Sequence, residues 1–470
     1  MSAPDRPVAE LPSPAAGRRL VAARAPDAPA VYVAWRGGEV ASADTALGAL
    51  AAVGRAPVVD PTGVSGVLWR GGPLDARLPL EGVVGVPAGG RVVFEDGRAR
   101  AEGSVTTAPP CDVATLEARL RAEIAGPSFA VLTRGGHPSL ALLALRALAG
   151  EPEADAFTVH WPGAPEPDVV EAGRTARVLR ARHHVLRPDA DEPEAALARF
   201  VATCDLPSLE GFRSALLDAA LARAGVARAA TPAGATALFG VGEPFASVAR
   251  GGLRLALRSR PPRALPDRFD LEGGRAVERA ALARVPVHAM QVELALLPAA
   301  ARDALTTAGP RPPDGTPAGV TPRARAVAEA ALRATADTEL RTPPPRTFRP
   351  FLAAPVVEAV RGLSDAARFG RPGSGGPLRG WLRRAHGWAS RTPAAGFHRS
   401  LDRWLRGPWA RWLETTLRAD RLAAQGLWRP EGVARLVETW RASATGTAAR
   451  AVFVVAATVA WVDRVRGSGS

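Results

Sequence analysis

The sequence predicts an α/β protein, with a strand-rich N-terminal domain at 1–125 and an α/β domain at 126–466 that is helical and basic after about 355. Two observations support this prediction. In the first region, short apolar runs alternate with glycine-rich turns, which is typical of strands and hairpins. From about residue 127, apolar runs of strand length alternate with single helical patterns. That alternation indicates a parallel, doubly wound sheet that binds ligands at the carboxyl ends of its strands.

The composition is that of a folded protein with a substantial core. The chain has 470 residues, enough for two or three domains, and 47% of them are hydrophobic. It contains no lysine, so all 60 basic residues are arginine, and this bias is typical of a GC-rich genome. Cys111 and Cys204 lie far apart and form no metal-binding spacing. With no signal-peptide core in the opening residues, we expect a reduced cytoplasmic protein.

Three segments of the N-terminal region are expected to form strands, because each combines an apolar run with glycine-rich turns. They are VYVAWRGG at 31–38, GVLWRGGP at 66–73 and VVGVPAGGRVVFEDGRARAEG at 83–103. In the last segment, Asp96-Gly97 stands between two runs and predicts a hairpin turn. A helix is expected to follow at about Val113–Ile124.

The next region alternates strands with helices. The expected strands are SFAVLT at 128–133, AFTVHW at 156–161 and HHVLRP at 183–188. The expected helices are Leu140–Leu148, Val169–Leu179, Ala195–Ala202 and Leu209–Ala224. A Pro/Gly-rich stretch, Ala308–Arg323, is expected to be a flexible connector.

The C-terminal quarter is expected to be helical. Eight of the eleven tryptophans lie beyond position 380, and their spacing favours packing between helices. The most apolar run, Ala451–Val462, is too short to cross a bilayer and is expected to be a buried helix. The closing GSGS at 467–470 resembles a linker.

Charge is concentrated in this quarter. From Arg361 to the end there are 19 arginines against 7 acidic residues, a balance of +12 out of the total of +14. Such a region is either a solvated helical surface or a docking face for an acidic partner. We expect a protein or peptide partner there and no membrane. Nucleic acid is disfavoured, because Glu414, Asp420, Glu431 and Glu438 interrupt the basic stripe.

The stretch VLTRGGHPSLALLAL, 131–145, has the layout of a strand, a phosphate-binding loop and a helix. Arg134, His137 and Pro138 nevertheless stand where a phosphate loop needs small residues and free N–H groups. The candidate phosphate-loop residues are Thr133, Arg134, Gly135, Gly136, His137 and Ser139. No spacing in the chain identifies a catalytic residue or a metal ligand.

The order of elements and five stretches of sequence resemble the asparagine synthetase B superfamily, particularly its lasso-peptide cyclase and β-lactam synthetase-like branches. The stretches are 79–97, 172–186, RPFLAAPVVEAV at 349–360, 376–401 and 421–440. The resemblance implies a glutaminase-like domain at 1–125, followed by a PP-loop synthetase domain that adenylates a carboxylate with ATP. It also implies that the pair His183-His184 is structural.

The family's charged residues are missing from the positions that the resemblance assigns to them. The glutaminase cysteine that follows Met1 is replaced by Ser2. In the pyrophosphate loop S-G-G-x-D-S-S, Arg134 replaces a glycine and His137 replaces the aspartate that helps to hold magnesium. Pro138 also removes one N–H.

Three further positions show the same loss. In the second motif, G-E-G-A-D-E-L-F-G-G, two acids become Thr236 and Ala237. The aspartate of the family's PFLD segment is replaced by Ala353. The lysine that the family carries two residues before the Gly-Phe pair, here Gly396-Phe397, is replaced by Ala394. That lysine stabilises charge on the adenylate in the family. The resemblance therefore implies retained packing residues beside an emptied ATP and magnesium site.

Three functions remain open on this basis. The first is a catalytically degenerate homologue that binds or scaffolds other proteins in natural-product biosynthesis, with ribosomal-peptide modification as one such pathway, and that needs no cofactor. The second is an ATP- and Mg-dependent amide-forming ligase with a rearranged site, in which Arg134 holds phosphate in place of the metal. The third is a metal-free activity in the old cleft, such as acyl transfer.

Overall fold

The computed structural model describes residues 18–25, 28–70, 78–95, 97–103, 108–125, 130–133, 136–150, 154–161, 167–187, 193–240, 329, 332, 335, 346–369, 376–386, 397–442 and 447–467. The expected connector Ala308–Arg323 lies outside these residues. Within them the α/β class is confirmed: a strand-rich N-terminal region is followed by a parallel five-stranded sheet and a helical C-terminal part.

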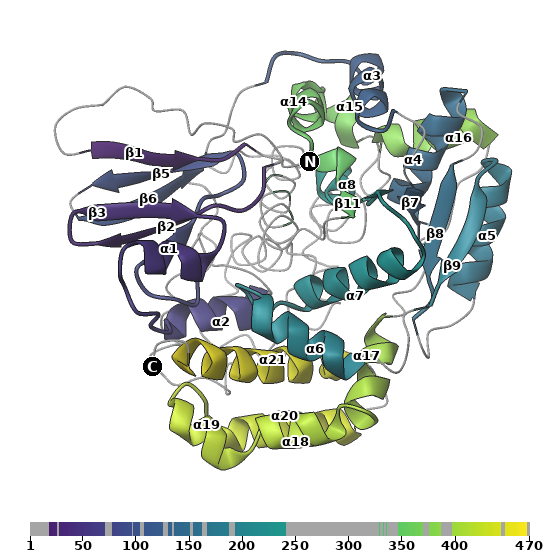
Figure 1. Cartoon of the computed structure of the whole chain (residues 1–470). Coiled ribbons are helices and arrows are strands. Elements are labelled where there is room, and N and C mark those ends of the chain that lie inside the picture. The colour runs from purple at the N-terminus through teal and green to yellow at the C-terminus, as the bar shows by residue number, and fades with distance from the viewer. Residues whose placement is uncertain are drawn as a thin grey trace, which may run out of the picture.

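The N-terminal strands form two antiparallel three-stranded sheets, in the orders β1-β5-β6 and β3-β2-β4, which Figure 1 shows stacked at one side of the molecule. The strands are β1 (Arg18–Ala23), β2 (Tyr32–Arg36), β3 (Glu39–Ala43), β4 (Val83–Gly85), β5 (Gly90–Glu95) and β6 (Arg98–Gly103). Small apolar side chains, including Ala22, Val33 and Val92, fill the space between them. The expected hairpin is confirmed, because Glu95 pairs with Arg98 and Gly97 has a φ of +73°.

The expected strand at 66–73 is wrong. Residues Pro61–Arg70 form helix α2, after the short helix α1 (Ala46–Ala52). Val64, Val67 and Leu68 are buried, and this spacing of three and four residues marks one face of a helix. This helix packs closely on its neighbours at Gly63, where an added Cβ would lie 1.9 Å from the carbonyl oxygen of Leu78.

The third sheet is parallel, in the order β11-β10-β7-β8-β9. Its strands are β7 (Ala130–Leu132), β8 (Asp155–Val159), β9 (Arg182–Leu186), β10 (Ala229–Ala230) and β11 (Thr347–Phe348). The helices of this region are α3 (Val113–Glu123), α4 (His137–Leu148), α5 (Pro167–Val178), α6 (Pro193–Thr203), α7 (Leu209–Arg223) and α8 (Ala235–Phe239). The three strands and the helices expected here are confirmed, with shifts of a few residues at their ends.

The chain after β11 is helical wherever it is described. The elements are the 3₁₀ turn η2 (Pro350–Leu352), α14 (Ala354–Gly362), α15 (Asp365–Phe369), α16 (Gly376–His386), α17 (Phe397–Arg406), α18 (Ala410–Thr416), α19 (Ala419–Gln425), α20 (Pro430–Ala442) and α21 (Thr447–Gly467). The expected buried helix is confirmed as part of α21, in which residues 452–457 have no exposed surface. Searched over the described residues, no helix is both long and apolar enough to cross a membrane.

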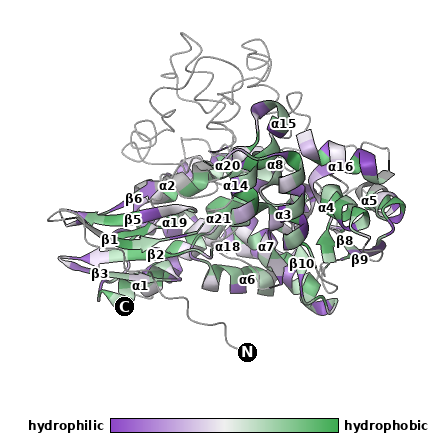
Figure 2. Cartoon of the chain, turned by 90° about the horizontal axis from the view of Figure 1, so that it is seen from above, coloured by the Kyte–Doolittle hydropathy of each residue, from purple (hydrophilic) through white to green (hydrophobic). Residues whose placement is uncertain are grey.

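Helix α21 joins the N-terminal and C-terminal parts of the chain. It contacts α2, α6 and α7 as well as α17 to α20, and Figure 2 shows it in the middle of the molecule, with hydrophobic residues along its length. Buried side chains from all these helices and from β2 belong to one continuous core. Six of the tryptophans beyond position 380 are buried, as expected: Trp381, Trp404, Trp409, Trp428, Trp440 and Trp461. Trp412 is half-buried, and Trp388 lies outside the described residues.

The two cysteines are expected to differ in reactivity. Burial raises the pKa of the Cys204 thiol to about 12, whereas Cys111 is half-buried. Because the thiolate is the reactive form, iodoacetamide at about pH 8 should alkylate Cys111 and leave Cys204 unmodified in the folded protein. Mass spectrometry of the native and denatured protein checks this. A Cys111→Ser variant should take up no label until it is unfolded, and rapid native labelling of that variant would contradict the burial of Cys204.

Candidate functional site

The strand order of the parallel sheet changes direction at β7. Strands β8 and β9 follow on one side of β7, and β10 and β11 lie on the other. The Thr133 N–H donates to the Phe157 carbonyl (2.8 Å), and the Thr231 N–H donates to the Phe348 carbonyl (2.9 Å). Because β10 pairs in parallel with both β7 and β11, the loops after these three strands start side by side. In sheets of this kind, ligands bind at this switch point, outside the carboxyl ends of the strands.

The loop after β7 contains the predicted phosphate-loop residues. Thr133, His137 and Ser139 are buried in it, and Gly136 precedes the first residue of α4. The Ser139 hydroxyl donates to the Gly136 carbonyl (3.1 Å), and its oxygen lies 3.1 Å from the Thr133 hydroxyl oxygen. These two hydroxyls are thus engaged within the loop. Arg134 and Gly135, the other two predicted residues, lie outside the described part of the chain.

The amino end of helix α4 points to the same edge of the sheet. Its N-cap is Gly136, which supplies no side-chain hydrogen bond, and proline occupies one of the first two helical positions. A helix N-terminus with uncapped N–H groups is a general anion-binding feature. Here Pro138 supplies no N–H, and His137, only 8% exposed, occupies the position that the family resemblance gives to the magnesium-binding aspartate.

The second motif packs against the PFL segment. Helix α8 lies between Gly234 (φ +88°) and Gly240 (φ +59°), conformations that favour glycine. A Cβ on Gly234 would lie 2.4 Å from Cδ2 of Leu352. Phe239 meets Phe351 edge to face, with ring centroids 6.0 Å apart. The glycines and aromatic residues that the resemblance singled out are therefore packing residues that hold the loops after β10 and β11 together.

The positions expected to carry acids are neutral and largely buried. Ala237 is 2% exposed and Ala353 is 6% exposed. In the described residues of the loops that follow the five parallel strands, 133–139, 160–161, 187, 231–235 and 349–353, there is no aspartate or glutamate. The charged or titratable side chains there are His137, His160, Arg187 and Arg349.

This edge of the sheet is therefore basic. The described part of the chain holds no group of three or more His, Cys, Asp or Glu side chains that could bind a metal ion. Magnesium prefers oxygen ligands, above all carboxylates. The described side chains at this edge do not match that preference, whereas arginine, histidine and the N-terminus of α4 suit an anion.

The histidine pair lies away from this edge. His183 Nε2 lies 2.9 Å from the Thr158 hydroxyl, and His184 Nε2 lies 2.8 Å from Asp155, at the start of β8. Burial, with smaller contributions from the charges of His184 and Arg177, lowers the pKa of His183. The contacts tie β9 to β8, which agrees with the structural role that the resemblance implies.

Sequence reasoning missed a buried ion cluster behind the second motif. Arg368, 1% exposed, donates from Nε to the Leu238 carbonyl (2.7 Å) and contacts Glu329 (3.2 Å), which also binds Arg361 (2.9 Å). Burial alone would raise the pKa of Glu329, but the charges of Arg368 and Arg361 outweigh it and lower that pKa. No spacing signals this cluster, because its members come together only when α8, α14 and α15 pack.

One protein-family model matches part of the chain. The asparagine synthase family model matches residues 347–463, which run from β11 into α21. A search of curated proteins finds no match. The matched region contains the PFL segment at the carboxyl edge and the helices that cover the core. Over residues 347–463 the chain is therefore similar to the asparagine synthase family.

Proposed function

We propose that this protein is a catalytically degenerate member of the asparagine synthetase superfamily, from its lasso-cyclase and β-lactam synthetase-like branch. It acts as a binding or scaffold subunit in natural-product biosynthesis, with a glutaminase-like domain at 1–125 and a doubly wound synthetase-like domain. One observation supports this most directly. The loops that meet at the carboxyl edge keep their packing residues, but they carry His137, Thr236, Ala237 and Ala353 where the family resemblance places acids.

The physical consequence concerns the triphosphate. ATP reaches such a site as a magnesium complex, and carboxylates neutralise and position the metal. Without them, the loop around His137 has no anchor for the metal. The missing lysine removes a further charge that is worth about 2.7–4 kcal/mol in transition-state stabilisation at comparable sites. Several such losses together would abolish useful adenylation.

The proposed partner is a pathway enzyme or a precursor peptide that docks on the arginine-rich C-terminal helices. Exposed arginines there include Arg403 on α17 and Arg411 on α18. Other arginines of these helices are already matched by acids, as in the pair of Arg418 with Asp420 at 2.8 Å. The exposed arginines of these helices that form no salt bridge with an acid in the described structure support a role in docking an acidic partner.

The alternative is an ATP-dependent amide-forming ligase. The amino end of α4 favours it, because its uncapped N–H groups still face the switch point of the sheet. In that case Arg134 would hold phosphate in place of the metal, and ATP would bind through backbone groups.

Calorimetric titration with ATP, with and without magnesium, separates the two proposals. We expect no saturable heat and no thermal shift at millimolar ATP in either condition. Micromolar, magnesium-dependent binding followed by AMP release would overturn the non-catalytic proposal. A His137→Asp variant serves as the matched comparison, because restoring a carboxylate at that position should increase magnesium-dependent binding if the loop keeps the family geometry.

A further inference from the structure

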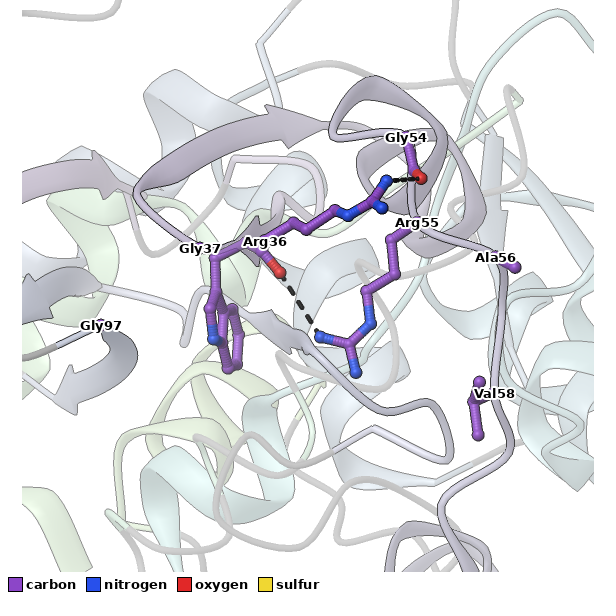
Figure 3. Close-up of a pocket in the computed structure, with 8 residues that line it drawn as sticks. Arg36, Gly37, Gly54, Arg55, Ala56, Val58 and Gly97 are labelled. Carbon is purple, nitrogen blue, oxygen red and sulfur yellow. Dashed lines mark hydrogen bonds between the residues drawn. The ribbon is translucent and has the colours of Figure 1, made fainter.

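An open hollow lies at one end of the N-terminal sheets, far along the chain from the loops described above. Its volume is about 850 Å³, within the range of ligand pockets in general. It is lined by Trp35, Arg36, Gly37, Gly54, Arg55, Ala56, Val58 and Gly97. These residues come from the end of β2 and its turn, the segment after α1, and the β5–β6 turn. Figure 3 shows the labelled residues around it, and we name it the Arg36–Arg55 hollow.

Two arginines cross this hollow in opposite directions. Arg36, at the end of β2, donates from Nη1 to the Gly54 carbonyl (2.6 Å). Arg55, in the segment after α1, donates from Nη1 back to the Trp35 carbonyl (3.4 Å), and its Nη2 lies 3.7 Å from the Glu81 carboxylate. Figure 3 shows the two side chains running past each other. Each guanidinium is thus tied to the backbone of the other's segment, which holds both in place before any ligand arrives.

The arginines keep donors for a ligand. A guanidinium has about five N–H donors, and the contacts of Arg36 and Arg55 engage only some of them. None of the eight lining residues is acidic, although Glu81 contacts Arg55 from outside the lining. Arg36 is exposed, so it is the more available cation.

Apolar surface lies next to these cations. The Val58 side chain is 47% exposed, which makes it one of the few large exposed hydrophobic residues in the described part of the chain. Trp35, another lining residue, is half-buried. Carboxylates pair with guanidinium groups through parallel hydrogen bonds, and a neighbouring apolar side chain would cover Val58 and Trp35.

We propose that the Arg36–Arg55 hollow binds an acidic segment of a partner polypeptide, one in which carboxylates alternate with apolar side chains. Charge complementarity selects this occupant, since two fixed cations lie beside apolar surface in a hollow without lining acids. The inference goes beyond the proposed function, because it involves neither the parallel sheet nor the C-terminal arginines.

Fluorescence anisotropy with the full chain tests this proposal. The probe is a short labelled peptide of alternating glutamate and leucine, compared with analogues that carry glutamine or lysine in place of glutamate. We expect only the glutamate peptide to bind, with an affinity that falls as salt is added. Val58→Glu should weaken binding about tenfold, which equals about 1.4 kcal/mol, and Val58→Lys should strengthen it.

The two variants Val58→Glu and Val58→Lys should fold like the wild type, so a change in peptide binding is not caused by unfolding. The side chain is exposed, and the Val58 carbonyl accepts the Glu81 N–H (2.8 Å) whichever side chain is present. An Arg411→Ala/Arg435→Ala variant, on the C-terminal helices, should bind the peptide normally. The proposal is overturned if both Val58 variants bind like the wild type, if only the C-terminal variant loses binding, or if inorganic tripolyphosphate displaces the peptide as well as an excess of unlabelled peptide does.

Discussion

Replacement of Trp409 by alanine is expected to lower the free energy of unfolding by about 3–5 kcal/mol, the usual range for removing a buried aromatic side chain. Trp409 has no exposed surface and lies where α7, α18 and α21 meet. Its ring centroid lies 5.2 Å from that of Trp404, 5.5 Å from Phe212 and 5.9 Å from Phe453. Urea denaturation followed by circular dichroism measures the change.

Two phenylalanine variants separate packing from hydrogen bonding. The Trp409 indole N–H has no hydrogen-bond partner among the described residues, whereas that of Trp461 donates to the Cys204 carbonyl (3.1 Å). Trp461→Phe should therefore cost about 1 kcal/mol more than Trp409→Phe. The difference is modest because Arg464 also donates to that carbonyl (2.7 Å). If Trp409→Ala were as stable as the wild type, the packing of α18 on α21 would be refuted.

Replacement of Arg368 by methionine is expected to destabilise the protein by about 3–5 kcal/mol, because it leaves a buried carboxylate with one partner fewer. Glu329 would lose its contact with Arg368 while keeping that with Arg361, and the Leu238 carbonyl at the end of α8 would lose the Arg368 donor. Because Arg368 binds the second motif directly, its loss should also loosen the loop after β10. Urea denaturation gives the stability, and hydrogen exchange over 235–239 reports on the loop.

The pH dependence of stability supplies the control. The pKa of Glu329 is lowered in the folded protein from its ordinary value of 4.5. Its ionised form is therefore favoured by folding, so its contribution is present above the unfolded-state pKa and is lost as pH falls through the folded-state pKa. Wild-type stability should decline below about pH 4.5, and Glu329→Gln should decline less over the same window. Equal slopes for the two proteins would exclude this ion cluster as the cause.

Much of the local structure was predictable from the sequence. The Asp96-Gly97 turn between apolar runs indicated the β5–β6 hairpin, and the uninterrupted apolar run at 451–462 indicated the centre of a buried helix. These features are local. The residues that favour a turn, and the spacing of apolar residues along a helix or strand, involve only a few neighbouring positions. The prediction failed at α2, where the glycines of the segment at 66–73 suggested turns but the spacing of Val64, Val67 and Leu68 fits a helix.

The candidate site was predictable only as a list of positions. The sequence alone shows that histidine, threonine and alanine stand where the resemblance expects acids. It does not show that the Ser139 hydroxyl bonds within its own loop, or that Gly234 lies against Leu352. Those contacts depend on how close two backbones approach, and no residue pattern specifies that distance.

The sequence by itself determined the fold class, most of the elements and the absence of the expected charges. Only the tertiary structure decided which distant groups meet. Arg368 reaches Glu329 across 39 residues of chain, and Arg36 and Arg55 cross between two segments to form a cationic hollow. The physical reason is that periodicity encodes which face of an element is buried, while the partner on that face follows from the packing of the whole core.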